Sequence, residues 1–202
     1  MFVQVLKGRT SDADGINRQL DRWSQELAPG AEGWLGATWG VTDDGTFLSV
    51  VRFSSEEAAR RNSDRPEQGA WWSETEKYFD GDVTFHDCRE VELVMDGGSN
   101  DAGFVQIIEG AVDDPAAAKA AQARVQEILP RVRSDVIGGV VAHHGDGGFT
   151  QAMYFTSEEE ARKGEAAMAE NEESAAAIAE LRSHGVGEPK FYDLRKPRFM
   201  GD

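Results

Sequence analysis

This 202-residue chain concentrates the groups that could do chemistry in the stretch from residue 62 to residue 72. Two adjacent tryptophans, Trp71 and Trp72, follow the amide side chains of Asn62 and Gln68. Indole rings stack on flat aromatic molecules, and nearby amides can orient such molecules through hydrogen bonds. The stretch indicates a substrate-binding site. The structural interpretation, with one tryptophan filling a core and the other covering its edge, stays open.

A second candidate stretch runs from Phe85 to Arg89 and contains His86 and the only cysteine, Cys88. Neighbours on a strand point to opposite faces, so His86 and Cys88 share one face and Arg89 lies on the other. Histidine titrates near neutrality, which makes His86 a candidate general base; a hydrogen-bonded structural histidine is the alternative. Cys88 lacks the neighbouring base that a nucleophilic cysteine requires.

The sequence pattern supports neither a metal site nor a nucleotide site. His143 and His144 are adjacent on an expected hairpin and point to opposite faces, so they make a poor chelate even with Asp146 nearby. No HExxH or CxxC spacing is present, no glycine-rich phosphate loop follows a strand, and no nucleophile elbow occurs. We therefore predict no metal site and no bound cofactor.

The elements that position these stretches belong to a sequence pattern that occurs twice in the chain. The residues from Phe53 to Arg61 return as Phe155 to Lys163, 102 positions later, and residues 2–8 match residues 104–110 at the same offset. A repeat of this length makes each copy a small domain rather than one turn of a solenoid. The predicted organisation is a first repeat over residues 1–95, a polar linker over 96–102 and a second repeat over 103–202.

Both repeats read as strand, helix, strand, strand, helix, strand. Apolar residues from Ile16 to Leu27 recur at helical spacing and place Trp23 on the buried face of the first helix. Pro66 should break the second helical region, which resumes over residues 70–79. The second repeat contains a long alanine-rich helix after its third strand. The expected strands are 2–6, 34–41, 47–53 and 83–94, then 104–110, 136–142, 149–155 and 190–194.

This order is that of the ferredoxin-like fold, a four-stranded antiparallel sheet with helices on one face. The other face also needs cover, and Gln4 and Gln106 indicate a polar point at matching positions on it. We predict an α+β protein in which two tandem ferredoxin-like βαββαβ repeats pack as an intrachain pseudo-dimeric α+β barrel.

The organisation resembles the dimeric α+β barrel superfamily, in particular the antibiotic biosynthesis monooxygenase-like proteins, in a fused two-repeat form. The phrase from Phe53 to Ala58, a strand end followed by an acidic helix start, is typical of that group. The group includes cofactor-free oxygenases of aromatic polyketides, haem-degrading enzymes, isomerases and many members of unknown activity. The resemblance therefore implies a fold and leaves the reaction open.

The resemblance also implies site residues. In the polyketide oxygenases an amide, a tryptophan four residues later and a tyrosine six residues after that line the pocket, and Gln68, Trp72 and Tyr78 have this spacing. Gln68 stands where asparagine is usual, and Asn62 lies earlier in the chain. An arginine on the last strand belongs to the same pattern, with Arg89 as the candidate. Which of the two adjacent tryptophans faces the lumen stays open, because they lie on different sides of the helix.

The composition limits the partners. The formal net charge of −16 gives an acidic surface that repels nucleic acid and anionic lipid heads, so we expect neither as a partner. A single cysteine suits a reducing compartment, and there is no signal peptide or apolar membrane span, which indicates a cytoplasmic protein. The fused repeats should form a monomeric pseudo-dimer, with further oligomerisation left open.

The hypothesis that follows is a monooxygenase-like protein that oxygenates a small phenolic or quinol compound without a bound cofactor. A tryptophan would orient the ring, Gln68 and Arg89 would hold an oxygen substituent, and His86 or Tyr78 would handle protons. Haem-degrading members carry a histidine near the end of the second helical region, and its absence here argues against haem. The alternative is a non-catalytic small-ligand-binding or degenerate α+β barrel protein.

The second repeat lacks counterparts of these site residues. At the offset of 102, the positions of Gln68, Trp71, Trp72 and Tyr78 hold three glutamates and a serine: Glu170, Glu173, Ser174 and Glu180. Carboxylates face water more readily than they line an apolar pocket. We therefore predict a single ligand site, in the first repeat.

Overall fold

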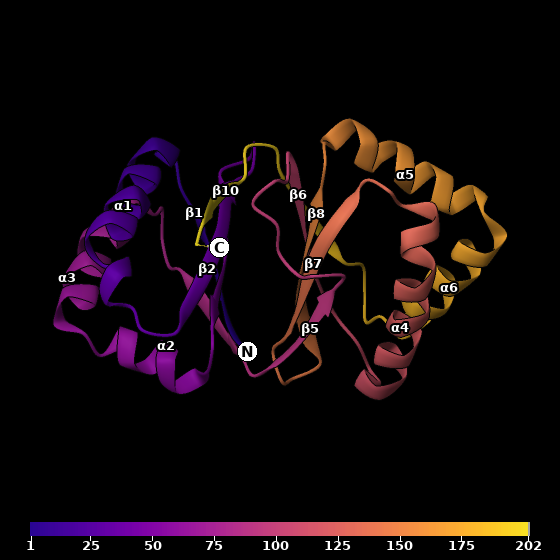
Figure 1. Ribbon diagram of the computed structural model, residues 1–202, viewed down its shortest axis with the longest axis horizontal. Coiled ribbons are helices and arrows are strands. Elements are labelled where there is room, and N and C mark those ends of the chain that lie inside the picture. The colour runs from indigo at the N-terminus through magenta and orange to yellow at the C-terminus, as the bar shows by residue number, and fades with distance from the viewer. Residues whose placement is uncertain (202) are drawn as a thin grey trace. The chain divides into compact units, whose positions relative to one another are not determined.

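The computed structural model describes residues 1–201, which form two compact units. Unit 1 contains residues 1–91 together with the chain from Pro197 onward, and unit 2 contains residues 92–196. Each unit has one five-stranded sheet with helices on one of its faces (Figure 1). The expected α+β architecture is confirmed, and one ferredoxin-like repeat supplies most of each unit. The closure of the two sheets into a barrel stays a prediction.

Unit 1 has the strand order β10-β2-β3-β1-β4, with neighbouring strands antiparallel. The strands are β1 (Phe2–Arg9), β2 (Trp34–Val41), β3 (Thr46–Phe53), β4 (Thr84–Cys88) and β10 (Arg198–Met200). The helices are α1 (Ala13–Glu26), α2 (Glu56–Ser63) and α3 (Pro66–Thr75), and the 3₁₀ turns are η1 (Ala28–Gly30) and η2 (Glu76–Tyr78).

Local sequence signals explain where the helices of unit 1 begin. The Asp12 carboxylate accepts a hydrogen bond from the Gly15 amide at 2.7 Å, and the Ser55 hydroxyl accepts one from the Ala58 amide at 3.2 Å. Both side chains satisfy amides that have no partner within the helix. Pro66 opens α3, a position where its missing N–H costs nothing. The expected break before Pro66 is confirmed, and the helix resumes directly after it.

Unit 2 has the strand order β5-β7-β8-β6-β9. Its strands are β5 (Glu90–Val94), β6 (Phe104–Ala111), β7 (Val136–His143), β8 (Gly148–Phe155) and β9 (Lys190–Leu194), and its helices are α4 (Pro115–Val132), α5 (Glu158–Glu170) and α6 (Glu172–Ser183). Asp114 caps α4 by accepting hydrogen bonds from two backbone amides. Among the described residues, no helix has both the length and the apolar character needed to span a lipid bilayer.

The expectation of one strand over residues 83–94 is wrong. β4 ends at Cys88 in the sheet of unit 1, and β5 begins at Glu90 in the sheet of unit 2. β10 also joins the sheet of unit 1, where Arg198 lies opposite Trp39 of β2. Each sheet therefore has five strands rather than the expected four. Alternating side chains show that a segment is extended, but they do not reveal where it changes its pairing partner.

The alanine-rich helix is also divided, into α5 and α6. Asn171 has an extended backbone between them, and its Oδ1 accepts a hydrogen bond from the Ser174 amide at 3.0 Å. A short amide side chain competes in this way with the hydrogen bonds of a continuing helix. Asn171 therefore ends one helix and caps the next.

Matched glutamines make the same contact in both units. Gln4 Nε2 donates to Asp87 Oδ1 at 2.9 Å, and Gln106 Nε2 donates to Asp193 Oδ1 at 3.1 Å. Arg162 of α5 also donates to Asp193, at 2.5 Å, and Gln4 lines a cavity beneath the helices of unit 1. The expectation that these polar points lie on the face away from the helices is therefore wrong. Each glutamine joins two neighbouring strands on the helix side of its sheet.

Candidate functional site

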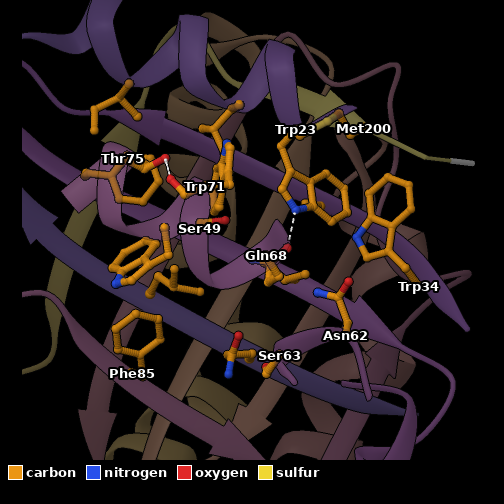
Figure 2. A pocket seen from close by; sticks show the side chains of 18 of the residues that line it. Trp23, Trp34, Ser49, Asn62, Ser63, Gln68, Trp71, Thr75, Phe85 and Met200 are labelled. Atoms are coloured by element: carbon orange, nitrogen blue, oxygen red, sulfur yellow. Dashed lines mark hydrogen bonds between the residues drawn. The ribbon is translucent and has the colours of Figure 1, made fainter. Parts of the chain in front are cut away.

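A cavity of about 290 Å³ lies in unit 1 between the sheet and its helices (Figure 2). Four tryptophans line it: Trp23 from α1, Trp34 from β2, and Trp71 and Trp72 from α3. We call it the tryptophan cavity. Phenylalanines and aliphatic residues of β1 and β3 complete an apolar wall, which is the usual character of a pocket for a small organic ligand.

The indole rings form a continuous aromatic surface. The ring centroids of Trp23 and Trp34 are 5.0 Å apart with an interplanar angle of 65°, and those of Trp71 and Trp72 are 6.1 Å apart at 48°. Trp72 also meets the edge of Phe85 at 5.2 Å. Both adjacent tryptophans therefore line this cavity, on the helix side of the sheet.

Hydrogen bonds fix the orientation of two amides in the wall. Trp23 Nε1 donates to Gln68 Oε1 at 2.7 Å, and Arg65 Nη1 donates to Asn62 Oδ1 at 3.0 Å. Because indole and guanidinium groups only donate, each amide must turn its oxygen toward them and keep its NH₂ group for another partner. Neither NH₂ group has a partner among the described residues.

A third N–H donor joins these amides. Trp34 Nε1 is buried and has no hydrogen-bond partner among the described residues. In Figure 2 the indole nitrogen of Trp34 faces the side of the cavity where Gln68 and Asn62 lie. A buried polar group without a partner is costly, so a ligand atom that accepts a hydrogen bond there would be stabilised. The three donors favour a ligand with oxygen acceptors.

The structure brings four of the expected site residues together and leaves three elsewhere. Asn62, Gln68, Trp71 and Trp72 line the tryptophan cavity. The other three expected residues, Tyr78, His86 and Arg89, do not line it.

Arg89 forms an ion pair outside the cavity. Its guanidinium donates to both carboxylate oxygens of Glu56, at 2.5 and 2.6 Å. This pair raises the pKa of Arg89 and lowers the pKa of Glu56. Arg195 and Glu158 of unit 2 form the matching pair at 2.8 and 3.0 Å. In both units, this ion pair connects the end of a strand to the first turn of a helix. We therefore assign Arg89 a structural role.

Tyr78 and His86 also lie away from the cavity wall. The ring of Tyr78 covers α1 so closely that a Cβ added at Gly15 would lie 2.2 Å from its Cδ1. His86 of β4 lies opposite Val5 of the neighbouring strand β1. Its side chain is on the face of the sheet opposite to that of Phe85. Burial raises the pKa of the Cys88 thiol to about 11, so this cysteine is a poor nucleophile, as expected.

Sequence reasoning missed several residues of the wall. The sequence predicts a helix core position for Trp23 and a strand start for Trp34, and Ser49 is one of the few polar residues on an apolar strand. That break in the apolar pattern of β3 was the available signal for Ser49. Met200 also lines the cavity, from β10, and no pattern predicted that strand.

No family model matches the sequence, and no curated protein matches it. The structure is similar to that of a proposed monooxygenase from Lactobacillus acidophilus, with 13% identity, a TM-score of 0.73 and coverage of 99% of this chain and 96% of that one. A proposed monooxygenase from Fusobacterium nucleatum is 11% identical, with a TM-score of 0.74 over 99% and 94% of the two chains. An anthrone oxidase-like protein is 16% identical, with a TM-score of 0.66 over 100% and 94%. This chain has a monooxygenase-like fold.

The monooxygenase-like fold confirms the resemblance that the sequence indicated. Because these matches span the whole chain, both repeats belong to the shared fold. At identities this low the likeness concerns the fold, and the reaction has to be argued from the site.

Proposed function

We propose that the tryptophan cavity binds a small flat aromatic molecule with phenolic or quinol oxygens, and that the protein oxygenates it without a bound cofactor. The observation that carries this proposal is the convergence of three N–H donors, on Trp34, Asn62 and Gln68, within a wall of indole rings. The rings suit the face of an aromatic ligand, and the donors suit its oxygen atoms. The likeness to an anthrone oxidase-like protein fits the same substrate class.

The donors would act on an anion of the substrate. Loss of a proton from an anthrone or a quinol gives an electron-rich anion whose charge is concentrated on oxygen, and N–H groups already in place stabilise such an oxyanion. Electrons then pass from the anion to O₂. For an anthrone, the ring CH₂ becomes a carbonyl with one oxygen atom of O₂, and the other oxygen leaves as water with the two hydrogens. The substrate supplies all four electrons, so no other reductant is required.

The proton has no side-chain acceptor in this cavity. No ionisable side chain lines it among the described residues, and His86 and Tyr78, which the sequence suggested for this step, lie elsewhere. Water would therefore take the proton. The donors would lower the free-energy cost of deprotonating the substrate, because they stabilise the anion. We expect the rate to rise with pH until the bound substrate is fully ionised. A bell-shaped dependence of the rate on pH, with the pKa values of protein side chains, would contradict this account.

Oxygen uptake by the full-length protein, measured with a panel of anthrones and quinols, tests the proposal. An anthrone substrate should consume one O₂ for each carbonyl formed. Trp34→Phe keeps an aromatic wall and removes one donor, so kcat/KM should fall by about tenfold or more. Lys77→Ala changes an exposed residue of η2 and should leave kcat/KM unchanged. Equal activity of Trp34→Phe and the wild type would refute the role of the donors.

The second candidate function is binding of the same ligands without turnover. The specific observation that favours it is that, within the part of the chain that the structure describes, no ionisable side chain lines the cavity. Tryptophan fluorescence that responds to quinols or anthrones, with no oxygen uptake beyond the spontaneous rate, would support this candidate. Uptake that saturates with substrate and requires Trp34 would exclude it.

The expected partners belong to the same proposal. The acidic net charge of −16 supports a protein that binds neither nucleic acid nor membranes, and the single cysteine supports a cytoplasmic location. The fused repeats support a monomeric pseudo-dimer. Light scattering on the eluting protein should give the mass of one chain, and a larger mass would show further association.

A further inference from the structure

Unit 2 has a cavity of its own, although the sequence predicted a site only in the first repeat. Its volume is about 480 Å³, and it lies between the sheet of unit 2 and helices α4 and α6. Glu170, Glu173, Ser174 and Glu180, the counterparts of the expected site residues, do not line it. The cavity shares positions such as those of Ile108, Phe149 and Gln151 with the tryptophan cavity, but its polar groups are its own, and its chemistry has to be derived from them.

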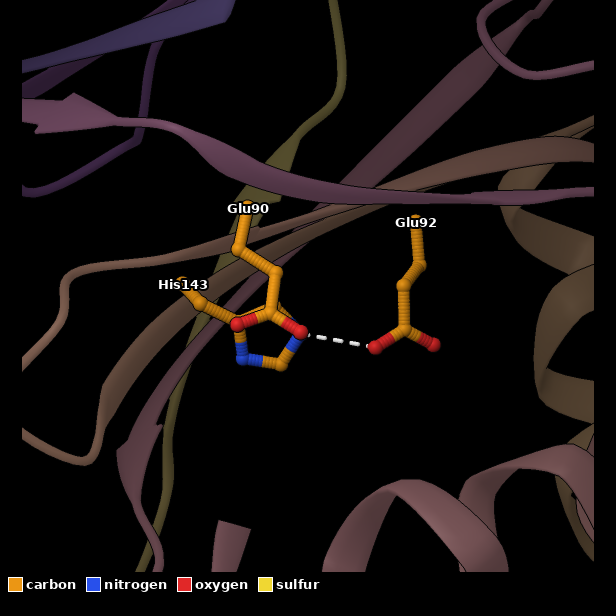
Figure 3. A group of neighbouring side chains, drawn as sticks. All are labelled: Glu90, Glu92 and His143. Carbon is orange, nitrogen blue, oxygen red and sulfur yellow. Dashed lines mark hydrogen bonds and ion pairs between the residues drawn. The ribbon is translucent and has the colours of Figure 1, made fainter. Parts of the chain in front are cut away.

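A histidine and a carboxylate lie side by side in this wall (Figure 3). His143 ends β7, Glu92 projects from β5, and His143 Nε2 lies 2.9 Å from Glu92 Oε1. The Lys119 ammonium lies 3.5 Å from the same oxygen. We call this space the histidine cavity. Glu90, the first residue of β5, has a carboxylate oxygen within 4.8 Å of His143 and Glu92 but does not line the cavity.

The contact with Glu92 decides which nitrogen of His143 can accept a hydrogen bond. A carboxylate only accepts, so Nε2 carries the proton that it donates to Glu92. In the neutral ring, Nδ1 then has a free electron pair. Nδ1 has no hydrogen-bond partner among the described residues. The imidazole is held in one tautomer and offers an acceptor, as a general base does before it receives a proton.

The rest of the wall is mainly apolar. Val141, Phe149, Ile178 and Leu181 surround the cavity, and Phe191 in the wall is 52% exposed. An exposed phenylalanine beside an open apolar cavity favours an apolar ligand that would cover it. The volume lies within the usual range of small-molecule pockets.

We propose that the histidine cavity is a second ligand site, which takes a small apolar molecule with a hydroxyl group, such as a phenol, and binds that hydroxyl through Nδ1 of His143. Glu92 acts as the positioning residue that holds the imidazole in the accepting tautomer. The acceptor Nδ1 distinguishes this site from the tryptophan cavity, whose unpaired groups donate, although Lys119 and Arg182 also line the histidine cavity. This inference does not depend on oxygenation in unit 1.

Binding of 2-naphthol and naphthalene to the full-length protein tests the proposal, because these molecules differ by one hydroxyl. Equilibrium dialysis with His143→Phe, which keeps a ring but loses the acceptor, should show 2-naphthol affinity reduced about tenfold. Naphthalene affinity should stay within about twofold, since a hydrogen bond adds nothing to it. Val141→Trp places in unit 2 the residue that fills the equivalent space of unit 1, and it should abolish binding of both molecules at this site.

Two spectroscopic signals separate the two cavities. All five tryptophans lie in unit 1, so quenching of their emission reports the tryptophan cavity alone. Nitrogen-15 NMR of the wild-type histidines should show the Nδ1 resonance of His143 move when 2-naphthol is added. This measurement needs no variant and survives any failure of His143→Phe to fold. A moving His143 signal without tryptophan quenching would support this site while the proposed function of unit 1 fails.

Three outcomes would overturn the proposal. The first is an unchanged Nδ1 resonance at saturating 2-naphthol. The second is equal loss of naphthalene and 2-naphthol affinity in His143→Phe, which would show that only the shape of the cavity matters. The third is loss of 2-naphthol binding after treatment with EDTA, which would assign His143 and Glu92 to a metal ion instead.

Discussion

Each unit has a cleft between its own sheet and helices, and the two cavities share equivalent positions such as Leu6 and Ile108 or Phe47 and Phe149, but extend from there along different residues. At the offset of 102, Trp39 and Ile16 of unit 1 correspond to Val141 and Ala118 of unit 2. Trp39 is 1% exposed and packed in the core of unit 1, and Ile16, 0% exposed, lies in the wall of the tryptophan cavity. The smaller Val141 and Ala118 of unit 2 both line the histidine cavity.

Other matched positions show the reverse. Arg133 and Asp135 form a buried ion pair in unit 2, and Arg133 stands where unit 1 has Ala31. Gly164 gives Arg133 its room, because a Cβ there would lie 2.2 Å from the Arg133 Nε. Unit 1 has Asn62 at the position of Gly164, and Asn62 lines the tryptophan cavity.

One backbone pattern can therefore hold cavities that extend in different directions from a shared region. Side-chain volume decides which neighbouring positions are filled, because cores are close-packed and tolerate few voids. The polar groups differ accordingly. The tryptophan cavity has amide and indole donors, and the histidine cavity has an imidazole acceptor. The following changes test this contrast.

Trp23→Ala should have the largest effect on stability. Trp23 is 6% exposed, meets Trp34 and Trp71 edge to face, and donates to Gln68. Truncating a buried tryptophan should lower the free energy of unfolding by about 3–5 kcal/mol, measured by urea denaturation followed by circular dichroism. Ligand affinity should fall as well, because Gln68 loses its support. The sequence alone predicted a purely structural role for Trp23.

A matched control for Trp23→Ala lies in unit 2. Phe191→Ala removes a half-exposed ring from the histidine cavity and should cost less than about 1 kcal/mol. Equal costs for the two changes would mean that the two cavities are packed alike.

Arg133→Ala should be comparably destabilising, by about 3–5 kcal/mol, since it leaves the Asp135 carboxylate buried without its partner. Replacing both residues with leucine should restore much of the loss, because no unpaired charge remains. The measurement is a double-mutant comparison of urea unfolding. A double variant as unstable as Arg133→Ala would show that the pair contributes more than compensation of a buried charge.

Gln68→Leu should weaken binding of a phenolic or quinol ligand to the tryptophan cavity by about tenfold, because it removes one donor and leaves the Trp23 N–H unpaired. Tryptophan fluorescence titration gives the affinity. Ser174→Ala, at the position that matches Trp72, should not change it. An equal loss in both variants would mean that stability rather than the donor controls affinity.

Arg89→Ala should have the smallest effect, with ligand affinity unchanged, because Arg89 contacts Glu56 outside the cavity. The pair lowers the pKa of Glu56 below its usual value of 4.5, so its contribution is present above that value and is lost as the pH falls through the lowered pKa. The urea midpoints of variant and wild type should converge on acidification. A specific loss of ligand affinity would restore Arg89 as a binding residue.

Much of the local structure could be predicted from the sequence. The strands at β2 and β9 have the expected bounds, and the second helical region is broken before Pro66 as predicted. The amides and tryptophans between residues 62 and 72 were identified because their side chains stand together in one helical region. Local signals of this kind act over a few residues and can be read directly.

The catalytic assignments for His86, Tyr78 and Arg89 depended on the family resemblance, and the structure does not bring them to the cavity. The pair of His143 and Glu92 was missed because 51 residues separate them. His143 was considered only with its neighbour His144, as a chelate. Sequence spacing cannot show which distant strands become neighbours in a sheet.

The sequence by itself determined the repeat, the order of its elements and the aromatic character of the first copy, because periodicity and turn residues act locally. Tertiary structure decided that β5 and β10 join sheets outside their own repeats, and that the cavities of the two units extend along different residues of the repeat. A cavity is a deficit of volume summed over several elements. Trp39 and Val141 acquire their opposite effects only after helices and sheet have come together.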